Sequence, residues 1–215
     1  DSIWIKAGES AGKLGATSIP EIVEQRVRDT WEPVAVRNAG LMAISKTANN
    51  IDFAILLEML NDGTVAIRSG SALALGNSGR KDAIQPLIEK LKSDGEEAVR
   101  RDSAKALGLI ADPSSEQALI KSFNEDGTAS VKNESAIALG NIKGSAGINA
   151  LINVVKDNTK ANDHRLNSAV ALGNAKATDA INALQTALAD NNGGIHFESA
   201  EALRKITGQS QGYER

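Results

Sequence analysis

Hydrophobic and polar positions recur along this chain in a fixed order, with a period of 31 to 33 residues. Each copy except one begins with a β-branched residue, which is usually followed by a basic residue, small residues and an Ala-Leu-Gly-like step. Apolar and small positions within a copy, such as Val99, Ser103, Ala104 and Leu107, fall at helical spacing. Self-similarity of this length is typical of a solenoid, in which each unit buries its apolar face against its neighbours. Seven copies are present, at residues 3–15, 36–48, 67–79, 99–111, 131–143, 164–176 and 195–207.

A complementary amphipathic pattern, such as Ile84, Leu87 and Leu91, lies between successive copies and predicts a first helix that precedes the second helix of each repeat. Turn residues such as Asp94 and Gly95 separate the two helices. The sequence therefore predicts an all-α fold, an α-solenoid of about six helix pairs plus an N-terminal half repeat. We expect one continuous domain with a half repeat at 1–15, repeats at about 16–48, 49–79, 80–111, 112–144, 145–176 and 177–208, and a polar tail at 209–215.

Small residues mark the positions where neighbouring backbones are expected to approach closely. One column is small in every copy: Ala7, Gly40, Ser71, Ser103, Ser135, Ser168 and Ser199. A later turn is glycine in five copies, where a missing side chain permits a close crossing or helps the helix to end: Gly12, Gly76, Gly108, Gly140 and Gly173.

The pattern Val-Arg-x-x-Ser/Ala-Ala-x-Ala-Leu-Gly, clearest at residues 99–108 and 131–140, resembles the HEAT-like repeats of the phycobilisome-lyase type. This resemblance covers nearly the whole chain. It implies that second helices line a concave surface and first helices form the convex one. Members of the family include bilin lyases, phycobilisome-associated factors and scaffold proteins without known chemistry, so the resemblance specifies the fold more closely than the activity.

On the implied concave surface, three columns of the second helices depart from the buried pattern. Charges lie towards both ends of the chain, and apolar or amide groups lie centrally, which is typical of a protein-binding patch with a polar rim. The amides of Asn77, Asn141 and Asn174 offer donors and acceptors to a partner backbone. The alternative is that Leu73, Ile137 and Val170 pack under the next helix. The predicted partner-binding residues are Leu73, Asn77, Arg101, Lys105, Leu109, Asn133, Ile137, Asn141, Leu166, Val170, Asn174 and Phe197.

A column of basic residues next to the buried stripe raises the question of nucleic-acid binding: Arg37, Arg68, Arg100, Lys132, Arg165 and His196. The net charge is −3 and aromatic residues make up only 3% of the chain, so the charge and the stacking surface typical of nucleic-acid binders are missing. We expect the column to form ion pairs with carboxylates of the preceding turns, such as Asp62, Asp94, Asp126 and Asp163. The predicted partner is another protein or peptide, with no nucleic acid and no membrane.

Catalytic constellations are scarce in this sequence. There is no cysteine and there are two histidines. His196 and Glu198 are two residues apart on a helix, so they point to different sides and make a poor metal pair. His164 stands in a column of Ile and Val, which predicts a partly buried structural imidazole. We expect no catalytic residue, no cofactor and no metal, and the leading hypothesis is a non-catalytic protein-binding scaffold.

Two further hypotheses remain open. The family resemblance supports a bilin lyase or a phycobiliprotein-handling factor, although the aromatic residues expected around a tetrapyrrole are limited to a few. The chain also begins inside a repeat, with Trp4 in place of the usual basic residue, which suggests head-to-tail self-association through Trp4 and Phe197. The first residue, Asp1, indicates a processed chain or a fragment. We expect a cytoplasmic protein, with secretion left open.

Overall fold

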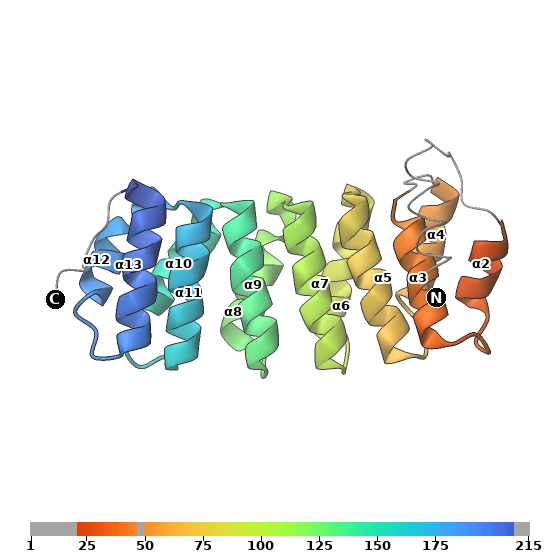
Figure 1. Ribbon diagram of the computed structural model, residues 1–215, viewed down its shortest axis with the longest axis horizontal. Coiled ribbons are helices and arrows are strands. Elements are labelled where there is room, and N and C mark those ends of the chain that lie inside the picture. The colour runs from red at the N-terminus through yellow and green to blue at the C-terminus, as the bar shows by residue number, and fades with distance from the viewer. Residues whose placement is uncertain (1–20, 47–49, 209–215) are drawn as a thin grey trace. The chain divides into compact units, whose positions relative to one another are not determined.

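The computed structural model describes residues 21–46 and 50–208, with the side chains from residue 52 onward in the second range, and all regular structure in these ranges is helical (Figure 1). The chain forms two compact units, residues 1–110 and 111–215, and each is described by itself. The predicted all-α solenoid of paired helices is confirmed. The half repeat at residues 1–15 lies outside the described residues.

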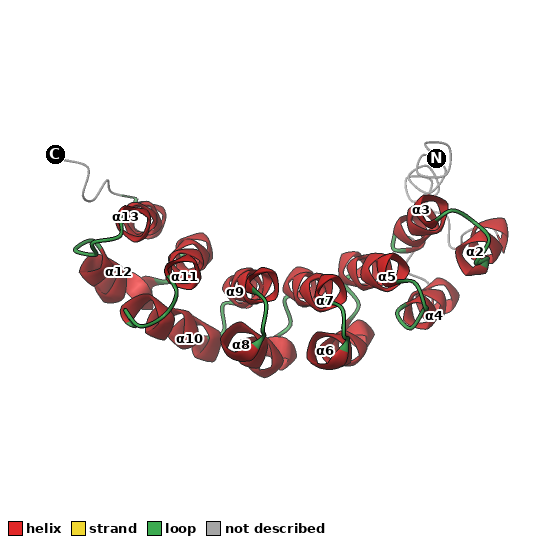
Figure 2. Cartoon of the chain, turned by 90° about the horizontal axis from the view of Figure 1, so that it is seen from below, coloured by secondary structure: helices red, strands yellow, loops and turns green. Residues whose placement is uncertain are grey.

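The described residues of the first unit form three helix pairs. Second helices α3, α5 and α7 pack side by side in one layer, and first helices α2, α4 and α6 cover one side of that layer (Figure 2). The helices of this unit are α2 (Glu21–Arg28), α3 (Val34–Ile44), α4 (Asn50–Met59), α5 (Val65–Ser78), the short 3-10 helix η1 (Lys81–Ala83), α6 (Ile84–Ser93) and α7 (Glu97–Ile110).

The second unit repeats the same arrangement. Its second helices α9, α11 and α13 form one layer, and its first helices α8, α10 and α12 form the other (Figure 2). The helices of this unit are η2 (Pro113–Ser115), α8 (Glu116–Glu125), α9 (Ala129–Ile142), α10 (Ser145–Lys156), α11 (Asn162–Ala175), η3 (Thr178–Ala180), α12 (Ile181–Ala187) and α13 (Gly193–Thr207). The prediction of one continuous domain stays a prediction.

Close contacts between second helices depend on glycine and alanine, as the sequence predicts. A Cβ added at Gly76 of α5 would lie 2.6 Å from the Ala106 Cα of α7. In the second unit, a Cβ at Gly173 of α11 would lie 2.7 Å from the Ala202 Cα of α13. Carbon atoms pack at about 3.5–4.0 Å, so only glycine allows the backbones to approach this closely. These contacts set the spacing of the side chains on the exposed face of each layer.

An ion-pair ladder connects consecutive repeats at the turns that precede the second helices. Arg37 Nη2 lies 2.5 Å from Asp62 Oδ2, and Arg165 Nη2 lies 2.6 Å from Asp190 Oδ2. Arg68 Nε similarly lies 2.9 Å from an Asp94 carboxylate oxygen. The predicted ladder is therefore present, and the charge of each of these three arginines is paired with a carboxylate.

The direction of the ladder differs from the prediction. Each of these arginines reaches the carboxylate of the following turn, whereas the preceding turn offers backbone oxygen, as in the 2.9 Å bond from Arg68 Nη1 to Asp62 O. Asp163, which was expected to take part, is exposed, and Arg165 pairs with Asp190 instead. The physical reason is that the aspartate of the preceding turn is already paired with the arginine of the preceding repeat, as Asp62 is with Arg37.

The turn aspartates also start the second helices. Asp62 Oδ1 accepts a hydrogen bond from the Thr64 backbone N–H at 2.7 Å, and Asp190 Oδ1 accepts one from Asn192 N–H at 2.8 Å. Burial by itself would raise the pKa of the Asp62 carboxyl, but the hydrogen bonds from Arg37 and Thr64 outweigh it, so the pKa is lowered. These carboxylates are therefore ionised at neutral pH and fix both the turn and the ladder.

Candidate functional site

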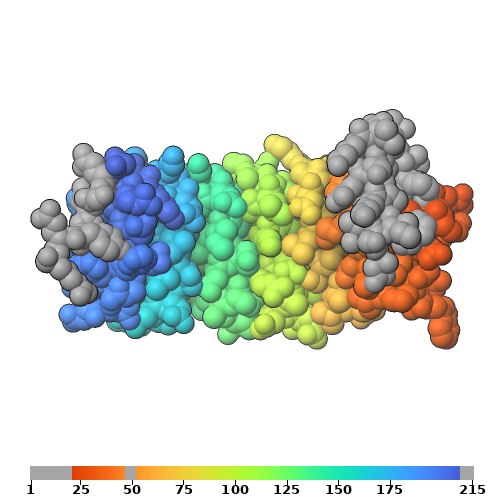
Figure 3. Space-filling model, viewed as in Figure 1, coloured from red at the N-terminus to blue at the C-terminus, as the bar shows by residue number. Residues whose placement is uncertain are grey.

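The candidate site is the face of the second helices that is not covered by first helices, here called the second-helix face. Figure 3 shows this face of each unit in space-filling form, with side chains of neighbouring second helices lying side by side. Every predicted partner-binding residue lies within the described part of the chain. None of them is fully buried. Trp4, predicted for an end-to-end contact, lies outside the described residues.

In the first unit, helices α5 and α7 carry five of the predicted residues. Asn77 and Lys105 are exposed, and Leu109 exposes 48% of its surface, while Leu73 and Arg101 are half-buried. Gly76 of α5 packs on Ala106 of α7, and these two residues are the sequence neighbours of Asn77 and Lys105 respectively. The face of this unit therefore combines an exposed cation, an exposed amide and an exposed leucine.

A polar contact that the sequence did not predict supports this part of the face. Asp102 is buried, it accepts a hydrogen bond from the Ser69 hydroxyl of α5, and its Oδ1 lies 2.9 Å from Arg101 Nε. The Asp102 carboxylate therefore holds the Nε end of the Arg101 guanidinium in place, while the Arg101 side chain as a whole remains 41% exposed. Sequence reasoning missed Asp102, although a signal was available, because its column is polar in four copies: Asp102, Glu134, Asn167 and Glu198.

In the second unit, the predicted apolar residues lie on the three neighbouring second helices, and this group is here called the apolar centre. Ile137 of α9 exposes 46% of its surface and Phe197 of α13 exposes 47%, and half-buried Leu166 and Val170 belong to α11, which packs between those two helices. The alternative that Ile137 packs under the next helix is therefore wrong, because nearly half of its surface remains accessible to solvent. Val170, and Leu73 of the first unit, are half-buried and so pack partly under their neighbours, and a partner-binding role of these residues stays a prediction.

Amide side chains flank this apolar centre on α9 and α11. Asn133 Oδ1 accepts a hydrogen bond from Asn167 Nδ2 at 2.8 Å, and Asn174 Oδ1 accepts one from Lys205 Nζ at 2.9 Å. The carbonyl oxygens of Asn133 and Asn174 are thus engaged, and their amide nitrogens keep two donors each. Such amides are suited to donate hydrogen bonds to the carbonyl oxygens of a partner backbone. Asn141, also exposed, lies on the same face of α9.

The described residues contain no group of three or more histidine, cysteine, aspartate or glutamate side chains placed to bind a metal. In the same parts of the chain, no helix is long and apolar enough to cross a membrane. His196, considered for a metal pair, has its Nδ1 2.6 Å from the Leu188 carbonyl oxygen, which accounts for that ring nitrogen by a local hydrogen bond.

The paired helices and their uncovered second-helix faces define an α-solenoid repeat protein. A sequence model of HEAT repeats matches residues 53–140 and 84–163, which together span just over half of the chain. The chain therefore belongs to the HEAT repeat family. None of the curated proteins compared with this sequence matches it.

Solved structures similar to this chain are repeat proteins with low sequence identity. A designed armadillo repeat protein in complex with the peptide (KR)4 is 17% identical, with a TM-score of 0.54 over 88% of this chain and 100% of that chain. The complex of CpcE and CpcF of phycocyanin lyase from Nostoc sp. PCC7120 is 19% identical, with a TM-score of 0.52 over 95% of this chain and 81% of that chain. An engineered protein is 19% identical, with a TM-score of 0.53 over 88% of this chain and 98% of that chain. At these identities the likeness shows the fold.

Proposed function

We propose that this chain is a non-catalytic protein-binding scaffold that docks an extended peptide segment on the second-helix faces. The observation that carries the proposal is the apolar centre of the second unit, where Ile137 and Phe197 are each nearly half exposed. The apolar residues in the buried columns of the same helices are, by contrast, buried. Exposed apolar side chains with a polar rim are typical of protein-binding surfaces.

The chemistry of the face indicates what kind of segment would fit. Aliphatic or aromatic side chains of the partner would cover Ile137, Val170 and Phe197, and backbone carbonyl oxygens of the partner would accept hydrogen bonds from Asn133 and Asn174. An extended segment presents both groups along its length, since its carbonyl oxygens are not used within a helix. The designed armadillo protein that binds the peptide (KR)4 supports peptide docking on a solenoid of this kind.

The experiment is selection of linear peptides from a phage-displayed random library, followed by binding measurements on single variants. Ile137→Asp places a charge in the apolar centre and should weaken binding of a selected peptide at least about tenfold, because a carboxylate would be desolvated on docking. Asn153→Asp adds the same charge at an exposed position of α10 in the first-helix layer and should leave binding unchanged. Equal binding by wild type and Ile137→Asp, with both helical by circular dichroism, would refute the site.

A second candidate function is a bilin lyase or a phycobiliprotein-handling factor. It is supported by the resemblance of the repeat pattern and by the similar fold of the phycocyanin lyase complex over 95% of this chain. Its test is incubation with a bilin and an apo-phycobiliprotein, with covalent chromophore as the readout. Absence of covalent product would exclude it. Head-to-tail assembly remains a prediction that sedimentation at high protein concentration would check.

A further inference from the structure

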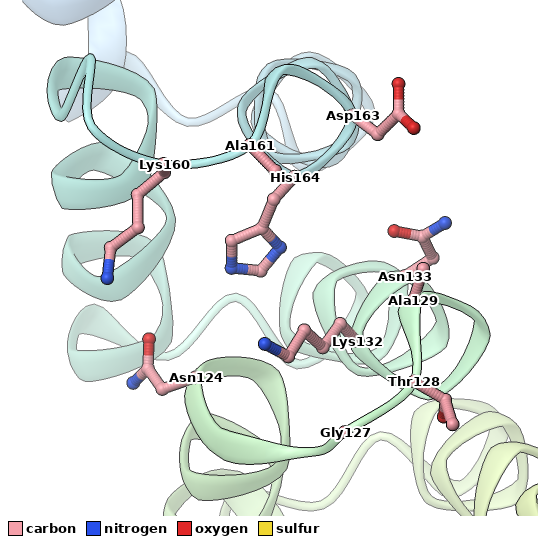
Figure 4. Close-up of a pocket in the computed structure, with 10 residues that line it drawn as sticks. All are labelled: Asn124, Gly127, Thr128, Ala129, Lys132, Asn133, Lys160, Ala161, Asp163 and His164. Carbon is pink, nitrogen blue, oxygen red and sulfur yellow. The ribbon is translucent and has the colours of Figure 1, made fainter.

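A pocket in the second unit interrupts the regular pattern of the repeats. It has a volume of about 310 Å³ and lies between the end of α8, the first turns of α9 and α11, and the loop that precedes α11. Figure 4 shows that the side chains of Lys132, Lys160, Asn124 and His164 point into the same space from four different segments. Asp163, the one carboxylate of the lining, points away from it (Figure 4).

Two positions of the pocket depart from their columns. In the basic column, Lys132 occupies the position at which Arg37, Arg68 and Arg165 pair with the aspartate of the following turn. The corresponding aspartate here is Asp157, whose Oδ1 accepts hydrogen bonds from the backbone N–H and the hydroxyl of Thr159 at 3.0 and 2.6 Å.

Neither Lys132 nor Lys160 forms an ion pair with a carboxylate of the described residues. The ladder is therefore open at this repeat, and two ammonium groups face the pocket without a carboxylate bound to them.

His164 is the second departure, since the other described copies have valine or isoleucine in its column. Its ring lies on Phe123 of α8, with the two ring centroids 4.3 Å apart, and the residue is half-buried. Burial lowers the pKa of the His164 imidazole, and the charges of Lys132 and Lys160 lower it further. The same two cations that line the pocket therefore add to the effect of burial in lowering the pKa of the imidazole.

We propose that this pocket binds a phosphate group, either free inorganic phosphate or the phosphate of a small monoester. Two ammonium groups match the charge of about −2 on a phosphate monoester at neutral pH. The Asn124 amide adds neutral donors, and the His164 ring adds a third cation when it is protonated. The volume is at the lower end of the range of about 300–1,000 Å³ for small-ligand pockets. This site shares Asn133 with the second-helix face, but its lysines lie outside the predicted partner-binding residues, so phosphate binding does not depend on the proposed docking of a peptide.

Binding of a dianion here should be visible at His164. A negative charge in the pocket offsets Lys132 and Lys160 and favours the imidazolium, so the pKa of His164 should rise when phosphate binds. By linkage, affinity for the dianionic form of phosphate should increase as the pH falls through the His164 pKa. The groups that face the ring are Lys132 from α9, Lys160 from the loop before α11, and the uncharged Asn124 and Phe123 from α8.

The test is an NMR titration of the imidazole signals from about pH 5 to pH 8, with inorganic phosphate or with chloride at the same ionic strength. The chain has two histidines, so His196 is an internal reference. We expect phosphate, and not chloride, to raise the pKa of His164. The double variant Lys132→Gln/Lys160→Gln should bind phosphate at least about tenfold more weakly, because its charge-assisted hydrogen bonds are lost. The exposed Lys92→Gln, in the first unit, should match wild type.

Glycerol phosphate serves as a second probe that distinguishes the two sources of the phosphate group. Binding of both probes assigns the site to a monoester, and binding of inorganic phosphate only assigns it to the free ion. An unchanged His164 pKa with both probes, an equal response to chloride, or equal weakening by Lys92→Gln would overturn the proposal. Circular dichroism of the lysine variants verifies that they are folded.

Discussion

Replacement of Gly76 by alanine tests whether close backbone contact holds the second helices together. An ideal Cβ at Gly76 would lie 2.6 Å from the Ala106 Cα, 2.8 Å from its Cβ and 3.2 Å from its carbonyl oxygen. Two of these three atoms are backbone atoms, so no side-chain rotation relieves the overlap. Carbon contacts are normally about 3.5–4.0 Å, so α5 and α7 would have to separate by about 1 Å.

The magnitude follows from two opposing effects. Alanine in place of a helical glycine favours the helix by about 1 kcal/mol. Overpacking at a close contact costs about 1–3 kcal/mol, and separation of the helices also loses dispersion contacts along their length. The net expectation is that Gly76→Ala lowers the free energy of unfolding by about 1–2 kcal/mol.

The assay is urea unfolding followed by far-UV circular dichroism, with Gly63→Ala as the matched control. Gly63 lies in the turn before α5, and a Cβ there meets no atom within 4 Å. Its substitution should be neutral or stabilising by about 0.4–1 kcal/mol, through the entropy of the unfolded chain. Gly76→Ala with the stability of wild type or higher would refute the close-contact explanation, and so would an equal loss in both variants.

Three further predictions concern the turns and helix ends. Asp62→Asn should destabilise the fold by about 3–5 kcal/mol in urea unfolding, because the buried Arg37 charge loses its partner, whereas Asp82→Asn at an exposed ion pair should cost about 1 kcal/mol or less. Since the pKa of Asp62 is lowered in the folded state, the stabilisation by its carboxylate should be present above about pH 4 and be lost as the pH falls through the folded pKa. In an acid titration, the free energy of unfolding of wild type should therefore fall more steeply with pH than that of Asp62→Asn. Glu116→Ala should cost about 1 kcal/mol in thermal unfolding, because the Glu116 carboxylate accepts a backbone N–H in the first turn of α10 at 2.7 Å, and Gln117→Ala is the control.

The helix pairs were predictable from the sequence because each column meets the same environment in every repeat. Leu75, Leu107, Leu139, Leu172 and Leu203 share one column, and all of them are fully buried. A residue type that recurs at a fixed period packs against equivalent neighbours in every repeat, so the period identifies which positions are buried in the core. The glycine contacts were predictable for the same reason.

Exposure on the second-helix face was less predictable. Leu73, Ile137 and Val170 occupy one column, yet Ile137 is exposed and the other two are half-buried. The difference depends on the side chains of adjacent helices, which vary from copy to copy on this face. Sequence columns therefore located the face and its amides, and the structure was needed to show which apolar side chains are accessible.

The pocket could not be predicted as a pocket, although one of its residues stood out. His164 departs from a column of Ile and Val, and the sequence alone interpreted it as a structural imidazole. The loop between α10 and α11 brings Lys160 to the same space, and the conformation of that loop is not encoded in the repeat period. A polar residue in an apolar column is informative in a solenoid, because the regular apolar residue is sufficient for packing and a polar one costs stability unless it has a partner or another role.

The two proposed sites share Asn133 and otherwise use different side chains, so their tests are independent. Asn133 is the one residue that lines the pocket and also belongs to the second-helix face, and Figure 4 shows its side chain directed away from His164. A substitution of Lys132 should therefore leave peptide docking at Ile137 unchanged, and Ile137→Asp should leave the His164 pKa unchanged. If both variants changed both readouts, the second unit would respond as one cooperative body, and neither site could be assigned from single substitutions.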